Sequence, residues 1–309
     1  MVLEIYKFVI IIGILSFLGT IGLAIVFRIL GQNHLIGNLY TNVRGGIPRG
    51  IGLVPCILLC MFLPKGLNAL ILTIGFFAFL DDILGRYKPK FLPIELGQLS
   101  RGIGMIVVMI MGYELLGFSS ILIALMIQPI NISDMQPGST CSVVIIMSLL
   151  ALLIGLPSNN LLHIYQVLIV LVCCIAYSPL DYAGRIMMGE VGNHSFAIAL
   201  GIVFYSIGGG FVNMLLFFII TTILIAFIRR NTMKTFFRKQ LKINNPVFGD
   251  FFMDVLTGGG LGDSLRKIFL GKKQIHVKNP ILMILGFRRL LYNPHAVKKQ
   301  QNYSLYLIF

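Results

Sequence analysis

Long apolar runs separated by short polar stretches constrain the fold of this chain more than any other feature. Of its 309 residues, 57% are hydrophobic and only 12% are charged. A soluble domain cannot hide that much apolar surface, so the pattern indicates a polytopic membrane protein. Backbone N–H and C=O groups in lipid must find partners within the protein, and helices provide them. We therefore predict an all-α fold. No cleavage pattern follows the first run, so we expect no signal peptide.

Nine segments are predicted to span the membrane: 8–30, 51–64, 67–80, 102–117, 119–131, 141–157, 161–178, 195–208 and 210–228. Several are shorter than the roughly 20 residues that a straight span needs. Short spans are tolerated where the helix lines a cavity or where the bilayer thins. We expect residues 1–228 to form a transmembrane domain and residues 229–309 to form a basic tail.

The distribution of basic residues predicts the orientation. With the N-terminus outside, only Lys7 and Lys65 of the 25 Lys and Arg residues face outward, as the positive-inside rule favours. The protein is thus expected in the cytoplasmic membrane, with its active face toward the cytoplasm. Its net charge of +14 then suits anionic membrane lipids or a phosphate-bearing substrate. Nucleic acid is not an expected partner, because no basic patch interleaves with aromatic residues on a soluble domain.

Acidic residues are scarce, and several of the 11 lie where predicted spans end on the cytoplasmic side. These are Asp81, Asp82, Asp134, Glu190 and the nearby Asp181. Asp81 and Asp82 follow an apolar helix, at the negative end of its dipole, where each carboxylate costs about 0.3–1 kcal/mol. They are either a solvated helix end or carboxylates whose charge is offset by nearby cations or a divalent metal.

Carboxylates from separate loops beside basic residues are typical of metal-assisted phosphoryl transfer. Mg²⁺ takes hard oxygen ligands, often one or two carboxylates, and completes its shell with water and substrate phosphates. The basic residues that could hold a diphosphate are Arg49, Lys88, Lys90, Arg101 and Arg185. Two glycine-containing loops, 44–52 and 189–195, lead into helices whose first N–H groups could bind anions. Each loop is also explained as an ordinary turn between spans.

Four segments carry a resemblance: GGIPRGIGLV (45–54), FFAFLDDILG (76–85), NISDMQPG (131–138) and DYAGRIMMGEVGNHSFAIALG (181–201). In this order they resemble the polyprenyl-phosphate N-acetylhexosamine-1-phosphate transferase family, which includes the MraY- and WecA-like enzymes. FFAFLDDILG is similar to its double-aspartate motif, and GGIPRGIGLV to the Pro/Gly-rich segment before its second helix. NISDMQPG stands in the place of the loop that helps to hold the nucleotide sugar. The last segment is the longest match, and the resemblance covers about residues 8–228.

The resemblance implies a reaction and a set of site residues. Undecaprenyl phosphate would receive a sugar-1-phosphate from a UDP-N-acetylhexosamine, releasing UMP, in cell-wall or surface-polysaccharide synthesis. Mg²⁺, or Mn²⁺ in its place, is the implied cofactor, and a homodimer is left open. Asp81 or Asp82 would activate or orient the lipid phosphate, and Asp82 and Glu190 would hold the metal. The implied substrate-binding residues are Arg49, Lys88, Lys90, Asn131, Asp134, Asp181, Arg185 and Asn193.

Several positions depart from the family's pattern. Glu190 stands in place of Asp, and its extra methylene can move the carboxylate by about 1 Å, a scale to which catalysis is sensitive. Asp181 replaces Asn, Asn193 replaces Ser, and the family's His-rich loop is not recognisable. A catalytically inactive member that serves as a binding or regulatory partner is therefore the alternative. A transporter is disfavoured, because transporters place ionisable residues near mid-membrane rather than at span ends.

Two segments of the tail invite separate predictions. TGGGLGDS (257–264) is glycine-rich, but no Gly-Lys-Ser/Thr follows it and no strand clearly precedes it, so we predict a flexible turn. Residues 280–299 mix apolar residues with Arg288, Arg289, Lys298 and Lys299. This mixture predicts a segment that lies at the membrane interface.

Overall fold

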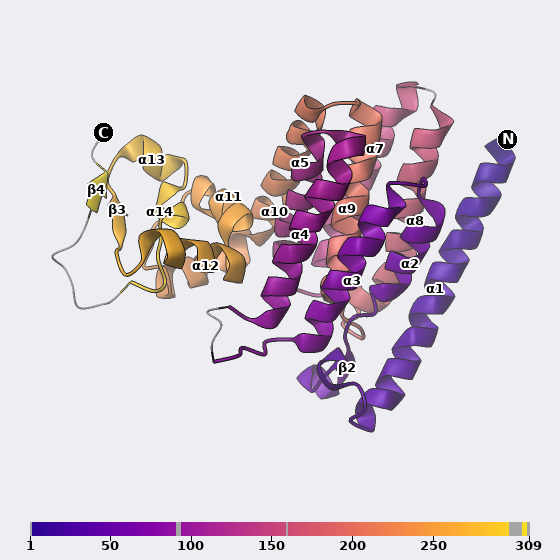
Figure 1. The fold of residues 1–309 in the computed structure, drawn as a ribbon, viewed down its shortest axis with the longest axis horizontal. Coiled ribbons are helices and arrows are strands. Elements are labelled where there is room, and N and C mark those ends of the chain that lie inside the picture. The colour runs from indigo at the N-terminus through magenta and orange to yellow at the C-terminus, as the bar shows by residue number, and fades with distance from the viewer. Residues whose placement is uncertain (1, 91–93, 159, 297–304, 308–309) are drawn as a thin grey trace. The chain divides into compact units, whose positions relative to one another are not determined.

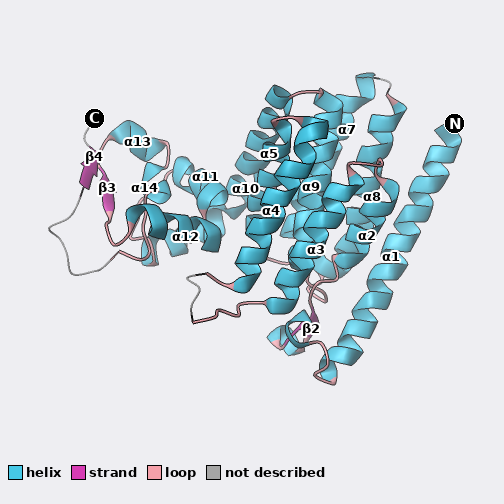
Figure 2. Cartoon of the chain, viewed as in Figure 1, coloured by secondary structure: helices cyan, strands magenta, loops and turns pink. Residues whose placement is uncertain are grey.

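A computed structural model describes residues 2–90, 94–158, 160–296 and 305–307, and their fold is nearly all α-helical (Figures 1 and 2). The chain divides into two compact units, Met1–Phe218 and Ile219–Phe309. The boundary predicted at residue 228 falls inside the long helix α10 (Phe211–Lys239), which belongs partly to each unit.

The first unit is a bundle of helices. They are α1 (Val2–Gln32), α2 (Leu53–Phe62), α3 (Asn68–Leu84), α4 (Leu96–Leu116), α5 (Ser119–Leu125), α6 (Ile127–Ser133), α7 (Ser139–Gly155), α8 (Leu161–Tyr182) and α9 (Gly189–Gly208), followed by the start of α10. Between α1 and α2 lie two 3₁₀ turns (Gly37–Leu39, Val43–Gly45) and an antiparallel pair of short strands, β1 (Tyr40–Thr41) and β2 (Ile47–Pro48). A third 3₁₀ turn, Leu156–Ser158, ends α7.

Five helices of the described residues are long and apolar enough to cross a membrane: Ile5–Gln32 within α1, α4, α8, α9 and α10. The prediction of a helical membrane protein is therefore confirmed at this coarser level. The other predicted spans fall on helices of 17 residues or fewer, such as α3 and α7, and segment 119–131 is broken at Met126 into α5 and α6. Nine spans and the orientation remain predictions.

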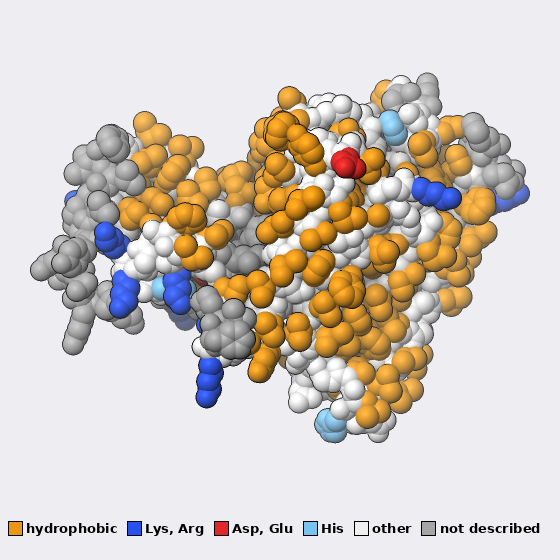
Figure 3. Space-filling view, viewed as in Figure 1, with side chains coloured by type: hydrophobic (Ala, Val, Ile, Leu, Met, Phe, Trp, Pro, Cys, Tyr) orange, Lys and Arg blue, Asp and Glu red, His pale blue; other side chains and the backbone are white. Residues whose placement is uncertain are grey.

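Helix α9 is the core of the first unit. It packs against α2, α3, α5, α6, α7 and α8, and every residue from Val191 to Phe204 is buried. In the most apolar 18-residue stretch of α9, 78% is buried inside the structure. The corresponding share in α1, which lies at the edge of the bundle, is 17% (Figure 1). The other helices turn apolar side chains outward, and Figure 3 shows them across the visible face of the bundle. An apolar exterior of this kind matches a lipid environment.

The second unit holds the end of α10, then α11 (Phe248–Thr257), α12 (Gly259–Leu270), α13 (Pro280–Ile284) and α14 (Phe287–Leu290). Two short strands, β3 (Ile275–Val277) and β4 (Leu305–Leu307), pair in parallel. The predicted flexible turn at 257–264 is wrong, because α12 begins at Gly259 and takes in most of that segment. The predicted interfacial segment forms α13 and α14, while its residues 297–299 lie outside the described residues.

Candidate functional site

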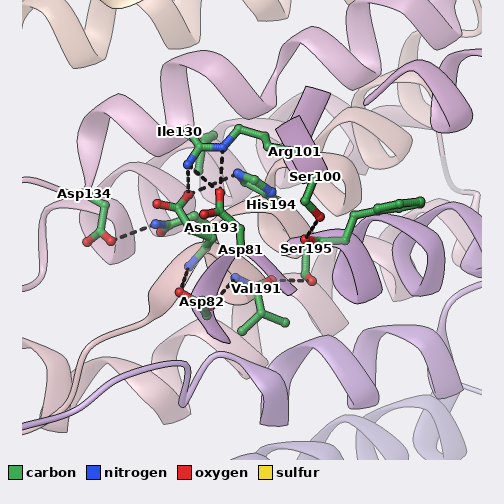
Figure 4. A network of polar contacts seen from close by, with 12 residues as sticks. Asp81, Asp82, Ser100, Arg101, Ile130, Asp134, Val191, Asn193, His194 and Ser195 are labelled. Atoms are coloured by element: carbon green, nitrogen blue, oxygen red, sulfur yellow. Dashed lines mark hydrogen bonds and ion pairs between the residues drawn. The ribbon is translucent and has the colours of Figure 1, made fainter. Parts of the chain in front are cut away.

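A cluster of polar side chains, gathered from segments far apart in the sequence, lies where α3 ends and α9 begins, and Figure 4 shows several of its members. We call it the polar cluster, and it consists of Arg49, Asp81, Asp82, Arg101, Asn131, Asp134, Glu190, Asn193 and His194. The last turn of α3, the first turns of α4 and α9, the end of α6 and the residue after β2 all contribute to it. Eight of the twelve site residues predicted from the sequence are thus brought together.

Asp82 caps the N-terminus of α9 from a different helix, α3. Its Oδ1 accepts a hydrogen bond of 2.9 Å from the backbone N–H of Glu190, and its Oδ2 accepts one of 3.0 Å from that of Val191. The first N–H groups of a helix have no partner within the helix, and a carboxylate there is favoured by the helix dipole. Gly189 makes this approach possible: its φ is +72°, and a Cβ on it would lie 2.6 Å from Asp82 Oδ2.

Arg49 connects Asp82 to Glu190. Its Nε lies 3.1 Å from Asp82 Oδ1, and its Nη2 lies 3.8 Å from Glu190 Oε1. The backbone N–H of Arg49 donates to the carbonyl of Leu39, which holds the residue in place just after β2. The Arg49 side chain is 26% exposed, whereas that of Asp82 is fully buried. Arg49 is therefore the cation of the cluster that can reach a bound ligand.

Arg101 holds Asp81 and Glu190 together. Its Nη2 lies 2.9 Å from Asp81 Oδ2 and 3.0 Å from Glu190 Oε2, and its Nε donates to Asp81 at 3.3 Å (Figure 4). When the amide of Asn131 is oriented to fit its neighbours, it accepts from Arg101 and donates to Glu190 Oε2, both at 2.6 Å. His194 Nε2 lies 3.3 Å from the same Glu190 oxygen. The Arg101 guanidinium is thus occupied by groups of the protein itself.

Asp134 and Asn193 form the remaining edge of the cluster. Asn193 Nδ2 donates a hydrogen bond of 2.7 Å to Asp134 Oδ2 (Figure 4). Removal from solvent raises the pKa of Asp134 to about 7, although the hydrogen bond from Asn193 opposes the rise. The Oδ1 atom of Asn193 is buried and accepts no hydrogen bond among the described residues. An acceptor without a partner beside a carboxylate is a place where a cation would fit.

Four predicted site residues lie outside the polar cluster. Asp181 Oδ2 instead accepts from the backbone N–H of Gly138 at 3.0 Å and from Cys141 Sγ at 3.3 Å, so it anchors the turn between α6 and α7. The side chains of Lys88, Lys90 and Arg185 are exposed. None of the three pairs with an acid of the polar cluster among the described contacts, and their expected role in binding the substrate stays a prediction.

Sequence reasoning overlooked His194, and it named Arg101 only as one of several cations. From the sequence, residues 189–195 are expected to be a glycine-containing loop that leads into a helix. They form the first turns of α9, where Glu190 and His194, four residues apart, lie on one face. Glu-x-x-x-His spacing could have revealed this pair if the helix had been predicted to begin at residue 189.

The balance of charge in the polar cluster favours a divalent cation. Asp81, Asp82, Asp134 and Glu190 face only two guanidinium groups, so about two negative charges are in excess when all four acids are ionised. No three His, Cys, Asp or Glu side chains of the described residues are arranged as a metal site by themselves. Mg²⁺ needs fewer protein ligands, because water and phosphates complete its shell. Asp134 and the Asn193 oxygen fit that role better than Asp82, both of whose oxygens accept hydrogen bonds from α9.

A scan against protein-family models and a search of curated proteins both found no match for this chain.

Proposed function

We propose that this chain is a membrane phosphotransferase that moves a sugar-1-phosphate from a UDP-N-acetylhexosamine to undecaprenyl phosphate and releases UMP. The observation that carries the proposal is the polar cluster, in which carboxylates, amides and guanidinium groups from five segments converge at one end of a membrane bundle. Phosphoryl transfer needs little covalent help from the protein. It depends on positioning the phosphates and on compensating their charge.

The residues of the polar cluster divide these tasks. Arg49 is the partly exposed cation, so we assign it the diphosphate of the nucleotide sugar. Asp134 and Asn193 are the oxygen donors assigned to Mg²⁺, which supplies charge neutralisation at the phosphates when bound. Arg101 positions Asp81 and Glu190, and Asp82 positions both Arg49 and the start of α9. Asp81 is the acid left to orient the lipid phosphate.

The reaction balances without an added reactant. An oxygen of the lipid phosphate attacks the phosphorus that carries the sugar, and the bond from that phosphorus to the oxygen of UMP breaks. The electron pair of the broken bond leaves with UMP. A phosphate monoester is largely ionised at neutral pH, because its second pKa is about 6. The attacking oxygen therefore needs to be oriented by Asp81 more than it needs to be deprotonated.

A second candidate is a protein that keeps the substrate contacts but does not catalyse transfer. The observation in its favour is that three carboxylates already have partners within the protein. Asp82 accepts two backbone hydrogen bonds, while Asp81 and Glu190 are paired with Arg101. Such a protein would bind the nucleotide sugar or the lipid and leave both intact.

The deciding experiment is UMP release by the purified protein in detergent with undecaprenyl phosphate, Mg²⁺ and UDP-N-acetylglucosamine, repeated with other UDP-sugars. Release that requires both lipid and metal supports the transferase. Arg49→Gln should then lower kcat by about a hundredfold, since it removes a charge that meets the reacting phosphates. Lys65→Gln, at an exposed position beyond the polar cluster, is the matched control and should turn over normally.

The same samples separate the two candidates. If folded protein binds a UDP-sugar without releasing UMP, the result supports the binding protein and contradicts the transferase. Folded protein that neither binds nor turns over any of these substrates would overturn both.

A further inference from the structure

Helix α12 of the second unit turns apolar side chains outward and a charged one inward. Leu265, Ile268 and Phe269 lie three and four residues apart, so they share one face of the helix, and all three are exposed. We call these three side chains the α12 face. Phe269 is 80% exposed, whereas Arg266 is only 7% exposed and pairs with Asp263. A helix of a soluble domain has the opposite arrangement, with its apolar stripe toward the core.

The next helices of the second unit repeat this arrangement. Ile281 and Ile284 of α13 are exposed, and Figure 3 shows apolar side chains gathered over this helix. Arg289 of α14 is buried instead, and its Nε lies 2.6 Å from Asp254 Oδ1. Large apolar side chains that are exposed together mark a surface that meets lipid or another protein.

The charge beside the α12 face is positive. Lys267, Lys272 and Lys273 are exposed and form no ion pair among the described residues. From residue 264 to the last residue, the sequence contains nine Lys and Arg residues and no Asp or Glu. Apolar side chains flanked by lysines are typical of helices that lie on a lipid surface with anionic headgroups.

The chain itself carries this unit to a lipid surface. The second unit begins within α10, which is one of the helices long and apolar enough to cross a membrane. Helix α12 has 12 residues, fewer than the roughly 20 that a span requires, so it can lie along a bilayer but cannot cross it. Lipid is therefore a better occupant for the α12 face than a separate protein, which would also need an acidic surface to match the lysines.

We propose that the α12 face docks on the anionic lipid surface of the bilayer into which α10 inserts. The three apolar side chains enter the boundary between headgroups and acyl chains, and the flanking lysines contact lipid phosphates. Helix α12 lies outside segment 280–299, for which the sequence predicts an interfacial position. The docking does not depend on the proposed transferase activity.

Full-length protein in lipid nanodiscs tests the proposal. Phe269→Cys carries an environment-sensitive nitrobenzoxadiazole label, and the discs contain phosphatidylcholine either alone or mixed with phosphatidylglycerol. In the mixed discs we expect the emission to shift to shorter wavelength and nitroxide-labelled lipid to quench it. Asn244→Cys, at an exposed position between α10 and α11, is the matched control and should emit as in water. The unsubstituted chain, most of whose five cysteines are buried, gives the labelling background.

Salt and a lysine variant test the contribution of charge. Added salt should release the label from the lipid, because it screens the lysines from the headgroups. Lys272→Gln should lower the ratio of docked to free helix about fivefold, so that less salt releases the label. Release of parent and variant at the same salt concentration, or equal quenching in discs without phosphatidylglycerol, would contradict an anionic surface.

Two other outcomes would overturn the docking itself. One is a label at position 269 that nitroxide-labelled lipid quenches no more than it quenches the label at position 244. The other is a shift to shorter wavelength without quenching, which would mean that protein rather than lipid covers the α12 face. Because the Phe269 side chain is mostly exposed, its replacement should leave the fold intact, and either outcome would count against the proposal.

Discussion

At the scale of single residues, Asp81 and Asp82 have different tasks although they are neighbours. Consecutive side chains leave a helix about 100° apart, so one acid faces α4 and the other faces α9. Asp81 pairs with Arg101, while Asp82 accepts the two backbone hydrogen bonds that begin α9. The unfavourable position of both acids at the end of α3 is thus offset by a cation for one and by a second helix dipole for the other.

This division predicts different outcomes for two otherwise identical substitutions. Asp82→Asn should destabilise the protein by about 1.5–3 kcal/mol, because an amide has one acceptor oxygen where α9 and Arg49 use two. Asp81→Asn, the matched control, keeps an acceptor for Arg101 and should cost less. The measurement is the thermal unfolding midpoint of both variants in detergent. Equal midpoints for Asp82→Asn and the parent would contradict the capping role. Asp81→Asn is then the cleaner test of transfer activity, since its fold is less disturbed.

At the scale of elements, a close approach between α2 and α9 places the polar cluster. The backbone N–H groups of Ile51 and Gly52 donate to the carbonyls of Met187 and Met188, at 3.3 and 3.0 Å. Gly52 also touches Gly192. These contacts hold the start of α9 beside Arg49. Glu190 and Asn193 therefore reach the polar cluster because two glycines, Gly52 and Gly192, let the backbones approach closely.

Gly52→Ala should therefore weaken the fold. A Cβ at this position would lie 2.6 Å from the carbonyl oxygen of Met188 and would clash with Gly192, and both are backbone atoms that cannot move aside alone. We expect a loss of about 1–3 kcal/mol, as for other overpacked contacts, visible as a lower unfolding midpoint. Gly22→Ala in α1 is the control, because a Cβ there meets nothing within 4 Å. Its midpoint should stay the same or rise, since alanine favours helix. If both variants behaved alike, the close approach would not matter to stability.

At the scale of the whole molecule, the sequence predicted the helices well and their ends poorly. Apolar runs indicate helices in a membrane because backbone N–H and C=O groups in lipid must be hydrogen-bonded within the segment. Each predicted span overlaps a helix. The start of α9 was missed because the segment contains glycines and was expected to be a loop, whereas the backbone N–H groups of Glu190 and Val191 donate hydrogen bonds to Asp82 and so cap a helix there. Arg101 could not be placed because its role arises from a contact between α4 and α9 that no local pattern encodes. His194 pairs with Glu190 within α9, and this pair was missed because the helix was not expected to begin at residue 189. The glycine-rich start of α12 misled in the same way.

The orientation of the bundle is the prediction on which the proposed function most depends. Lys65 lies between α2 and α3, and Lys88 follows α3 at the end that carries Asp81 and Asp82; both side chains are exposed. With the basic residues inside, a membrane-impermeant maleimide should label Lys65→Cys in intact cells. It should label Lys88→Cys only in inverted vesicles. The unsubstituted chain, most of whose free cysteines are buried, is the background control. The opposite pattern would turn the polar cluster away from the cytoplasmic pool of UDP-sugars, and the transferase would then have no donor substrate to use.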